Sequence, residues 1–111
     1  MTFANLRGFG LAMAMAAATF QQLAATPARA QEIQITIDNF TFSPPELKVK
    51  VGDTVTWTNH DDIPHTVVSA GKFRSNTMDT DDKYSFTFTS AGDYKYFCAL
   101  HPHMTGMIKV E

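Results

Sequence analysis

The chain has 111 residues, of which 44% are hydrophobic and 18% are charged, and its formal net charge is −2. This length predicts one domain, and a chain without a basic charge balance is not expected to bind nucleic acid. One cysteine excludes an intramolecular disulfide and any four-cysteine zinc site, and the apolar content is too high for a disordered chain.

The first thirty residues differ in character from the rest. They include Arg7 and Arg29 but no acidic residue, and residues 9–18 are all apolar or glycine. An Ala-Arg-Ala sequence ending at Ala30 places small residues where a signal peptidase needs them. Together these features predict a cleavable signal peptide over residues 1–30. The alternative, a retained membrane anchor, needs about twenty apolar residues, twice the length of this run.

Residues 31–111 would then form the mature protein outside the cytoplasm, in a bacterial periplasm. We expect a monomer with no stable membrane insertion after cleavage. Disulfides form in that compartment, yet Cys98 has no partner within the chain. Such a cysteine pairs with another chain, remains a free thiol or binds a ligand.

Apolar and polar residues alternate with a period of two along residues 31–111, and no window there has good helical periodicity. This pattern predicts short strands with one buried face and one face in water. Many such strands separated by turn residues indicate a sandwich or barrel. The strands are expected at residues 33–37, 47–51, 54–58, 65–69, 84–89, 94–97 and 107–110.

An immunoglobulin-like sandwich is the competing fold. It combines a buried tryptophan with a tyrosine that lies two residues before the second of two bridging cysteines. Trp57, Tyr96 and Cys98 match half of this pattern, but the other cysteine is missing. The sequence therefore favours a different sandwich.

Cys98 begins a segment rich in metal-binding side chains, Cys-Ala-Leu-His-Pro-His-Met, directly after the strand predicted at residues 94–97. With His101, Met104 and the upstream His65, it offers a thiolate, two imidazoles and a thioether. Such donors select copper, and two histidines, one cysteine and a distant methionine are the ligands of blue-copper electron-transfer sites. Each residue alone is better explained by packing or hydrogen bonding, but together they predict a metal site.

These residues give the chain a resemblance to the cupredoxins, and most closely to the amicyanin type. The resemblance implies an all-β Greek-key sandwich or barrel in which His65, Cys98, His101 and Met104 bind one type 1 copper ion. Two residues separate His101 from Met104, as in the short amicyanin-type loop. The resemblance extends over residues 40–111 and includes the stretches 50–57, 63–65, 84–89 and 91–94.

The resemblance further implies a soluble periplasmic one-electron carrier and not an enzyme. All four ligand positions are filled by protein atoms, whereas a catalytic metal usually keeps one position open for water or substrate. The partners would be redox proteins, such as a dehydrogenase, a cytochrome or a copper oxidoreductase. They would dock briefly near His101, because redox encounters bury small interfaces.

Two other functions stay open at this stage: copper storage, delivery or resistance, and a metal-free interaction domain. The acidic segments 61–62 and 79–82 have two interpretations, loops that steer a basic partner and solvated loops, of which the second is preferred. Four further candidates for copper binding are assigned surface or packing roles instead: His60, His103, Met78 and Met107.

Leu100 departs from the amicyanin-type loop, which carries proline at this position. Unlike proline, leucine has a backbone N–H group. We expect this group to donate a hydrogen bond to the Cys98 sulfur. Because hydrogen bonds to the sulfur tune the reduction potential, the potential is expected to exceed that of a Leu100→Pro variant.

Overall fold

The computed structural model describes residues 29–111, so nearly all of the predicted signal peptide lies outside the described residues. The described part is all-β, and none of it forms a helix that is long and apolar enough to cross a membrane. The strands in chain order are β1 (Glu32–Asp38), β2 (Thr41–Ser43), β3 (Glu46–Val49), β4 (Thr54–Asn59), β5 (Val68–Ser69), β6 (Phe73–Arg74), β7 (Lys83–Thr87), β8 (Gly92–Phe97) and β9 (Thr105–Val110).

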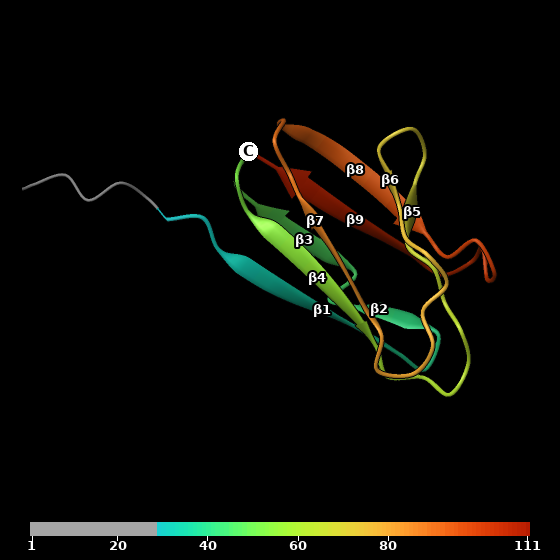
Figure 1. The fold of residues 1–111 in the computed structure, drawn as a ribbon. Coiled ribbons are helices and arrows are strands. Elements are labelled where there is room, and N and C mark those ends of the chain that lie inside the picture. Colours follow the sequence, from blue (N-terminus) through green and yellow to red (C-terminus); the bar gives the residue numbers. More distant parts are fainter. Residues whose placement is uncertain (1–28) are drawn as a thin grey trace, which may run out of the picture.

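Two sheets pack against each other as a sandwich (Figure 1). The first has the strand order β2-β1-β4-β7 and the second has the order β3-β9-β8-β5-β6. Both are mixed, because β1 pairs with β4 and β3 with β9 in parallel, while the other pairs are antiparallel. The prediction of an all-β sandwich is confirmed.

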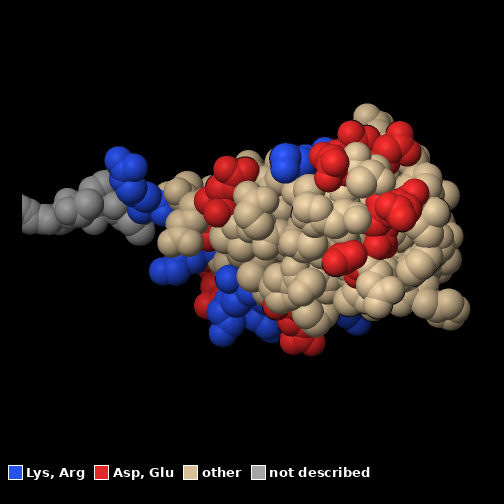
Figure 2. Space-filling model, turned by 90° about the horizontal axis from the view of Figure 1, so that it is seen from below, with Lys and Arg blue, Asp and Glu red and all other residues tan. Residues whose placement is uncertain are grey.

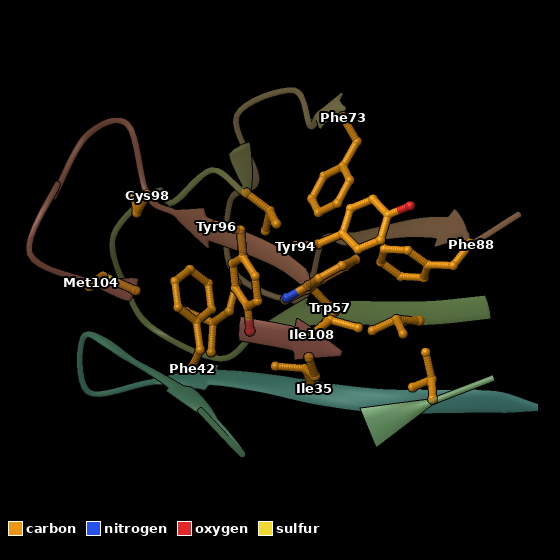
Figure 3. Close-up of a cluster of buried hydrophobic side chains, with 14 of the residues drawn as sticks. Ile35, Phe42, Trp57, Phe73, Phe88, Tyr94, Tyr96, Cys98, Met104 and Ile108 are labelled. Carbon is orange, nitrogen blue, oxygen red and sulfur yellow. The ribbon is translucent and has the colours of Figure 1, made fainter. Parts of the chain in front are cut away.

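The core between the sheets is rich in aromatic side chains (Figure 3). Trp57 of β4 lies in the middle and is fully buried. Its ring centroid is 5.4 Å from that of Tyr96, 5.6 Å from that of Phe73 and 5.7 Å from that of Tyr84. Such tilted and edge-on ring pairs stabilise a small core beyond the apolar area that they bury.

The turn between β3 and β4 shortens one predicted strand. The alternation predicted a strand through Val51, but β3 ends at Val49 and the Val51 side chain is 49% exposed. Gly52 reverses the chain there with a φ of 101°, a conformation that residues with a Cβ rarely adopt. The apolar pattern therefore continued one step into the turn.

The strand predicted at residues 65–69 is also shorter in the structure. Only β5, at Val68–Ser69, belongs to a sheet, whereas His65 joins Met78 through an isolated bridge. The stretch between them is shaped by contacts with loops and not by a neighbouring strand. The strands β2 and β6 were not predicted, because strands of three and two residues are too short to show a period.

Asp53 follows Gly52 and ties the turn to the start of β1. Its carboxylate accepts hydrogen bonds from the backbone N–H groups of Lys50 and Gln31, both at 2.9 Å. These bonds, opposed by burial and assisted by the Lys50 charge, hold the pKa of Asp53 below its usual value. A carboxyl group with a lowered folded-state pKa stabilises the fold above its unfolded pKa of about 3.9. That stabilisation is lost as the pH falls through the folded value.

We expect Asp53→Asn to be less stable than the parent protein at pH 7 and to lose less of its stability on acidification. Urea midpoints at pH 7 and pH 3 measure both effects. Asp62→Asn, which removes an exposed carboxylate, is the control and should follow the parent. An equal fall in midpoint for Asp53→Asn and the parent would show that Asp53 does not carry this pH dependence.

Candidate metal centre

The segment that begins at Cys98 forms a closed loop at one end of the sandwich. It leaves β8 after Phe97 and enters β9 at Thr105. Three backbone hydrogen bonds span it: Cys98 N–H to the Met104 carbonyl (3.1 Å), His101 N–H to the Cys98 carbonyl (3.1 Å) and Met104 N–H to the His101 carbonyl (2.8 Å). The spacing of the three predicted ligands is thus built into the backbone of the loop.

His65 reaches the same end from the segment after β4. Its N–H donates to the Met78 carbonyl at 3.1 Å, and its carbonyl accepts from the Met78 N–H at 2.8 Å. The Asn59 side-chain amide donates to the carbonyls of Ile63 and Met78, both at 3.0 Å. These bonds fix His65, the preceding Ile63 and the facing Met78, and the His65 side chain is fully buried.

Three donor atoms converge where these segments meet. Cys98 Sγ lies 3.6 Å from Nδ1 of His65 and 3.6 Å from Nδ1 of His101, and all three atoms lie within 4.8 Å of one another. A first-row metal with bonds of about 2.3 Å to sulfur and about 2.0 Å to nitrogen places the sulfur roughly 3.5–3.7 Å from each nitrogen at tetrahedral to trigonal angles. The cluster therefore fits a metal ion. Within residues 29–111, it is the one such group of His, Cys, Asp or Glu.

The fourth predicted ligand, Met104, lies at the same end of the core as Cys98 (Figure 3). Met104, Cys98 and His65 are buried, whereas His101 is half-buried. Enclosed thiolate, imidazole and thioether donors are typical of a type 1 copper site. His101 is the member of the set that faces the surface, in a pocket that Phe40 and Leu100 help to line.

The Cys98 sulfur also accepts hydrogen bonds from Thr66. The backbone N–H lies 3.3 Å away and the hydroxyl 3.9 Å away, and the hydroxyl accepts from the Ala99 N–H at 2.8 Å. The backbone N–H of Leu100 donates no hydrogen bond to this sulfur in the described structure. The prediction of a bond from Leu100 to Cys98 is therefore wrong. Thr66, adjacent to the ligand His65, faces the sulfur, and the Leu100 side chain is exposed at the surface.

Asp61 is a site residue that the sequence analysis missed. Its Oδ2 lies 2.7 Å from Nε2 of His65, although the residue was interpreted as part of a solvated loop. An ionised carboxylate only accepts hydrogen bonds, so this contact assigns the proton to Nε2 and leaves the Nδ1 lone pair for a metal. Burial raises the pKa of Asp61. Hydrogen bonds from the Phe40 N–H, the His65 ring and the Asn39 N–H together lower it by more than burial raises it, so the pKa lies below its usual value.

The weaker candidates take the roles that the sequence analysis preferred. His60 and His103 are exposed and are not part of the donor cluster. Met78 is buried and contacts His65 through its backbone, and Met107 is half-buried within β9. No extra ligand is assigned from these four residues.

Exposed carboxylates surround the loops next to the site. The Asp81 N–H donates to the Asn59 carbonyl at 2.6 Å, which joins the loop of residues 79–82 to the end of β4. Asp62 and the three aspartates of that loop are exposed. Figure 2 shows carboxylates gathered on the half of the domain away from the first described residues, while most Lys and Arg side chains lie elsewhere. The surface beside the site is therefore acidic.

Residues 10–110 match the family model of the cupredoxin-like domain. The chain belongs to the cupredoxin family. It is 41% identical over 85 residues to amicyanin of Paracoccus denitrificans, covering 71% of this chain and 65% of the relative, slightly less than two thirds. It is 34% identical over 119 residues to amicyanin-alpha of Methylorubrum extorquens, and this match covers 97% of this chain and 94% of the relative. A solved copper(I) structure of an amicyanin variant has a TM-score of 0.69 and 40% identity, covering 71% of this chain and 81% of that one.

This membership confirms the resemblance to amicyanins. Because amicyanins are electron-transfer proteins and not enzymes, it also confirms the prediction that the chain is not an enzyme. The cluster of His65, Cys98, His101 and Met104 is of the kind that holds copper in this family.

Proposed function

We propose that the chain is a soluble periplasmic one-electron carrier, secreted by a signal peptide over residues 1–30. Four side chains bind one copper ion: His65, Cys98, His101 and Met104. The observation that carries this proposal is the convergence of Cys98 Sγ with the two imidazole Nδ1 atoms, each 3.6 Å away, in a buried cluster. Likeness to amicyanins supports it.

The copper ion, when bound, supplies the one-electron couple. The protein holds the donors so that they move little between oxidation states, since the loop bonds and the Asn59 amide fix both ligand segments. The Thr66 N–H faces the Cys98 sulfur and influences the reduction potential. Burial of His65 and Cys98 keeps water away from the site.

Electrons are proposed to pass through His101, because this ligand is half-buried while His65 and Cys98 are fully buried. Phe40 and Leu100 line the same surface pocket and are 46% and 50% exposed. An apolar rim around an accessible ligand suits short-lived docking of a redox protein, such as a dehydrogenase, a cytochrome or a copper oxidoreductase.

The visible absorption spectrum of residues 31–111 loaded with Cu(II), recorded before and after ascorbate, tests this proposal. We expect an intense blue thiolate-to-copper band that bleaches on reduction and returns on reoxidation without loss of copper. A pale copper protein that exchanges its metal would instead favour copper storage or delivery. A protein that retains no copper would favour a metal-free interaction domain.

A further inference from the structure

We propose that Asp61 is a positioning residue that couples a strained aromatic turn to the ligand His65, so that the Phe40 ring covers the two imidazoles. This inference rests on the proposed copper site. It assigns to Asp61 and Phe40 the task of holding one ligand and restricting access to the metal.

The turn between β1 and β2 holds two residues in a strained backbone conformation. Asp38 pairs with Thr41, which leaves Asn39 and Phe40 as the two turn residues. Both have positive φ values, 52° and 58°. Two-residue turns of this kind prefer asparagine and glycine, so asparagine is expected here and phenylalanine is not. A bulky residue held in this region is backbone strain of the kind found at functional sites.

The strained turn places the Phe40 ring against both histidine ligands. Its centroid is 5.5 Å from that of His65 and 5.1 Å from that of His101, with interplanar angles of 88° and 85°. Phe40 forms T-shaped pairs with both imidazoles, and part of its side chain is exposed to solvent. Phe40 therefore stands between water and the two ligands.

One carboxylate holds both the turn and the ligand. Asp61 Oδ1 accepts the Asn39 N–H at 2.6 Å, and Oδ2 accepts the Phe40 N–H at 2.9 Å and the Nε2–H of His65 at 2.7 Å. Asp61 is itself held, because its N–H donates to Oδ1 of Asn59 at 2.8 Å. A movement of the turn is thus transmitted to the imidazole through a single side chain.

Only a carboxylate accepts all three bonds. In Asp61→Asn one of the two oxygens becomes an amino group, which would point its hydrogens at the Asn39 N–H or at the Phe40 N–H and the His65 ring. The substitution therefore removes one or two of the bonds with little change in volume. Asp62→Asn removes the same charge from the neighbouring, exposed residue and touches none of these groups, which makes it the matched control.

The first test needs no copper and uses ¹⁵N NMR on protein expressed from the full sequence. The parent should show a slowly exchanging His65 Nε2–H signal and protected amides at Asn39 and Phe40. In Asp61→Asn we expect protection at the affected donors to fall at least tenfold, and in Asp62→Asn to stay within twofold of the parent. Unchanged protection in Asp61→Asn would overturn the coupling.

The second test measures transfer of Cu(I) from the loaded protein to a chelator. Phe40→Ala removes the ring but keeps its N–H, so it separates the ring from the hydrogen bonds of the turn. We expect transfer at least tenfold faster for Phe40→Ala and Asp61→Asn, and within twofold of the parent for the control Asp62→Asn.

Transfer at the parent rate in Phe40→Ala would overturn the covering role of the ring. A parent protein that binds no copper would overturn the proposed function instead. In that case the NMR experiment still decides whether Asp61 joins the turn to His65, so the two failures are distinguishable.

Discussion

Cys98→Ser is expected to abolish the blue copper band and one-electron exchange completely, while the domain stays folded. Both imidazole Nδ1 atoms face the Cys98 sulfur at 3.6 Å, so this atom is the centre of the donor set. A soft thiolate supplies the bond to copper that defines a blue site, and a serine hydroxyl is a hard donor that stays protonated near neutral pH. The visible spectrum and cyclic voltammetry of copper-loaded protein measure the loss.

The fold should survive this change because the described sheets are held by a core that does not involve a metal. Trp57 and its aromatic neighbours fill the space between the sheets. Zinc fingers, which are unfolded without their metal, are the contrasting case. We expect metal-free Cys98→Ser and the metal-free parent to give the same far-UV circular dichroism. His103→Ser, an exposed change in the same loop, should keep the blue band.

Either of two results would contradict this prediction. A blue band retained in Cys98→Ser would mean that the sulfur is not the ligand responsible for the colour. A metal-free parent that is unfolded by circular dichroism would mean that copper, and not the aromatic core, maintains the sandwich.

The ligand set was predictable because its chemistry is local. Three of the four residues lie within seven positions, and the backbone bonds that shape their loop join Cys98, His101 and Met104 to one another. The spacing in the sequence therefore already contains the geometry of the loop. His65 was identified through the family resemblance, because it ends the Ile-Pro-His stretch at residues 63–65 and a copper site of this kind needs a second imidazole.

Asp61 and Phe40 were not predictable from a local pattern. Their contact joins residues 21 apart, and adjacent aspartates are typical of solvated loops. Nothing in the sequence separates Asp61, which is buried against His65, from Asp62, which is exposed. Likewise, the bond from Thr66 to the sulfur of Cys98 spans 32 residues and depends on how the two segments pack.

The strands show the same division between local and non-local information. Alternation located β1 and β4, whose inward residues pack in the core. It failed where a turn or a loop contact ended the pattern, as at Val51 and between His65 and Val68. At residues 65–67 the side chains stay buried without belonging to a sheet strand, whereas at Val51 the apolar pattern continues into an exposed turn. A period of two therefore does not by itself mark where a strand ends.

Gly106→Ala is expected to destabilise the domain by about 1–3 kcal/mol, which lowers the Tm by on the order of 10 °C. Gly106 of β9 pairs with Tyr96 of β8, and an added Cβ would overlap Cζ and the hydroxyl of Tyr96 and lie 2.8 Å from its Cε1. The ring has little room to move, since it is 1% exposed and its centroid lies 4.7 Å from that of Phe42 and 5.4 Å from that of Trp57. Thermal and urea unfolding measure the loss.

A double-mutant cycle shows whether overlap with the ring is the cause. Tyr96→Leu removes the ring, so Gly106→Ala should cost less in that background, with a coupling energy of at least about 0.5 kcal/mol. Thr105→Ala, at the exposed neighbouring position, controls for alanine in a strand. Additive losses would assign the effect to strand propensity instead. Tyr96 precedes Cys98 by two residues and Gly106 follows Met104 by two, so this close contact lets β8 and β9 converge where the ligand loop begins and ends.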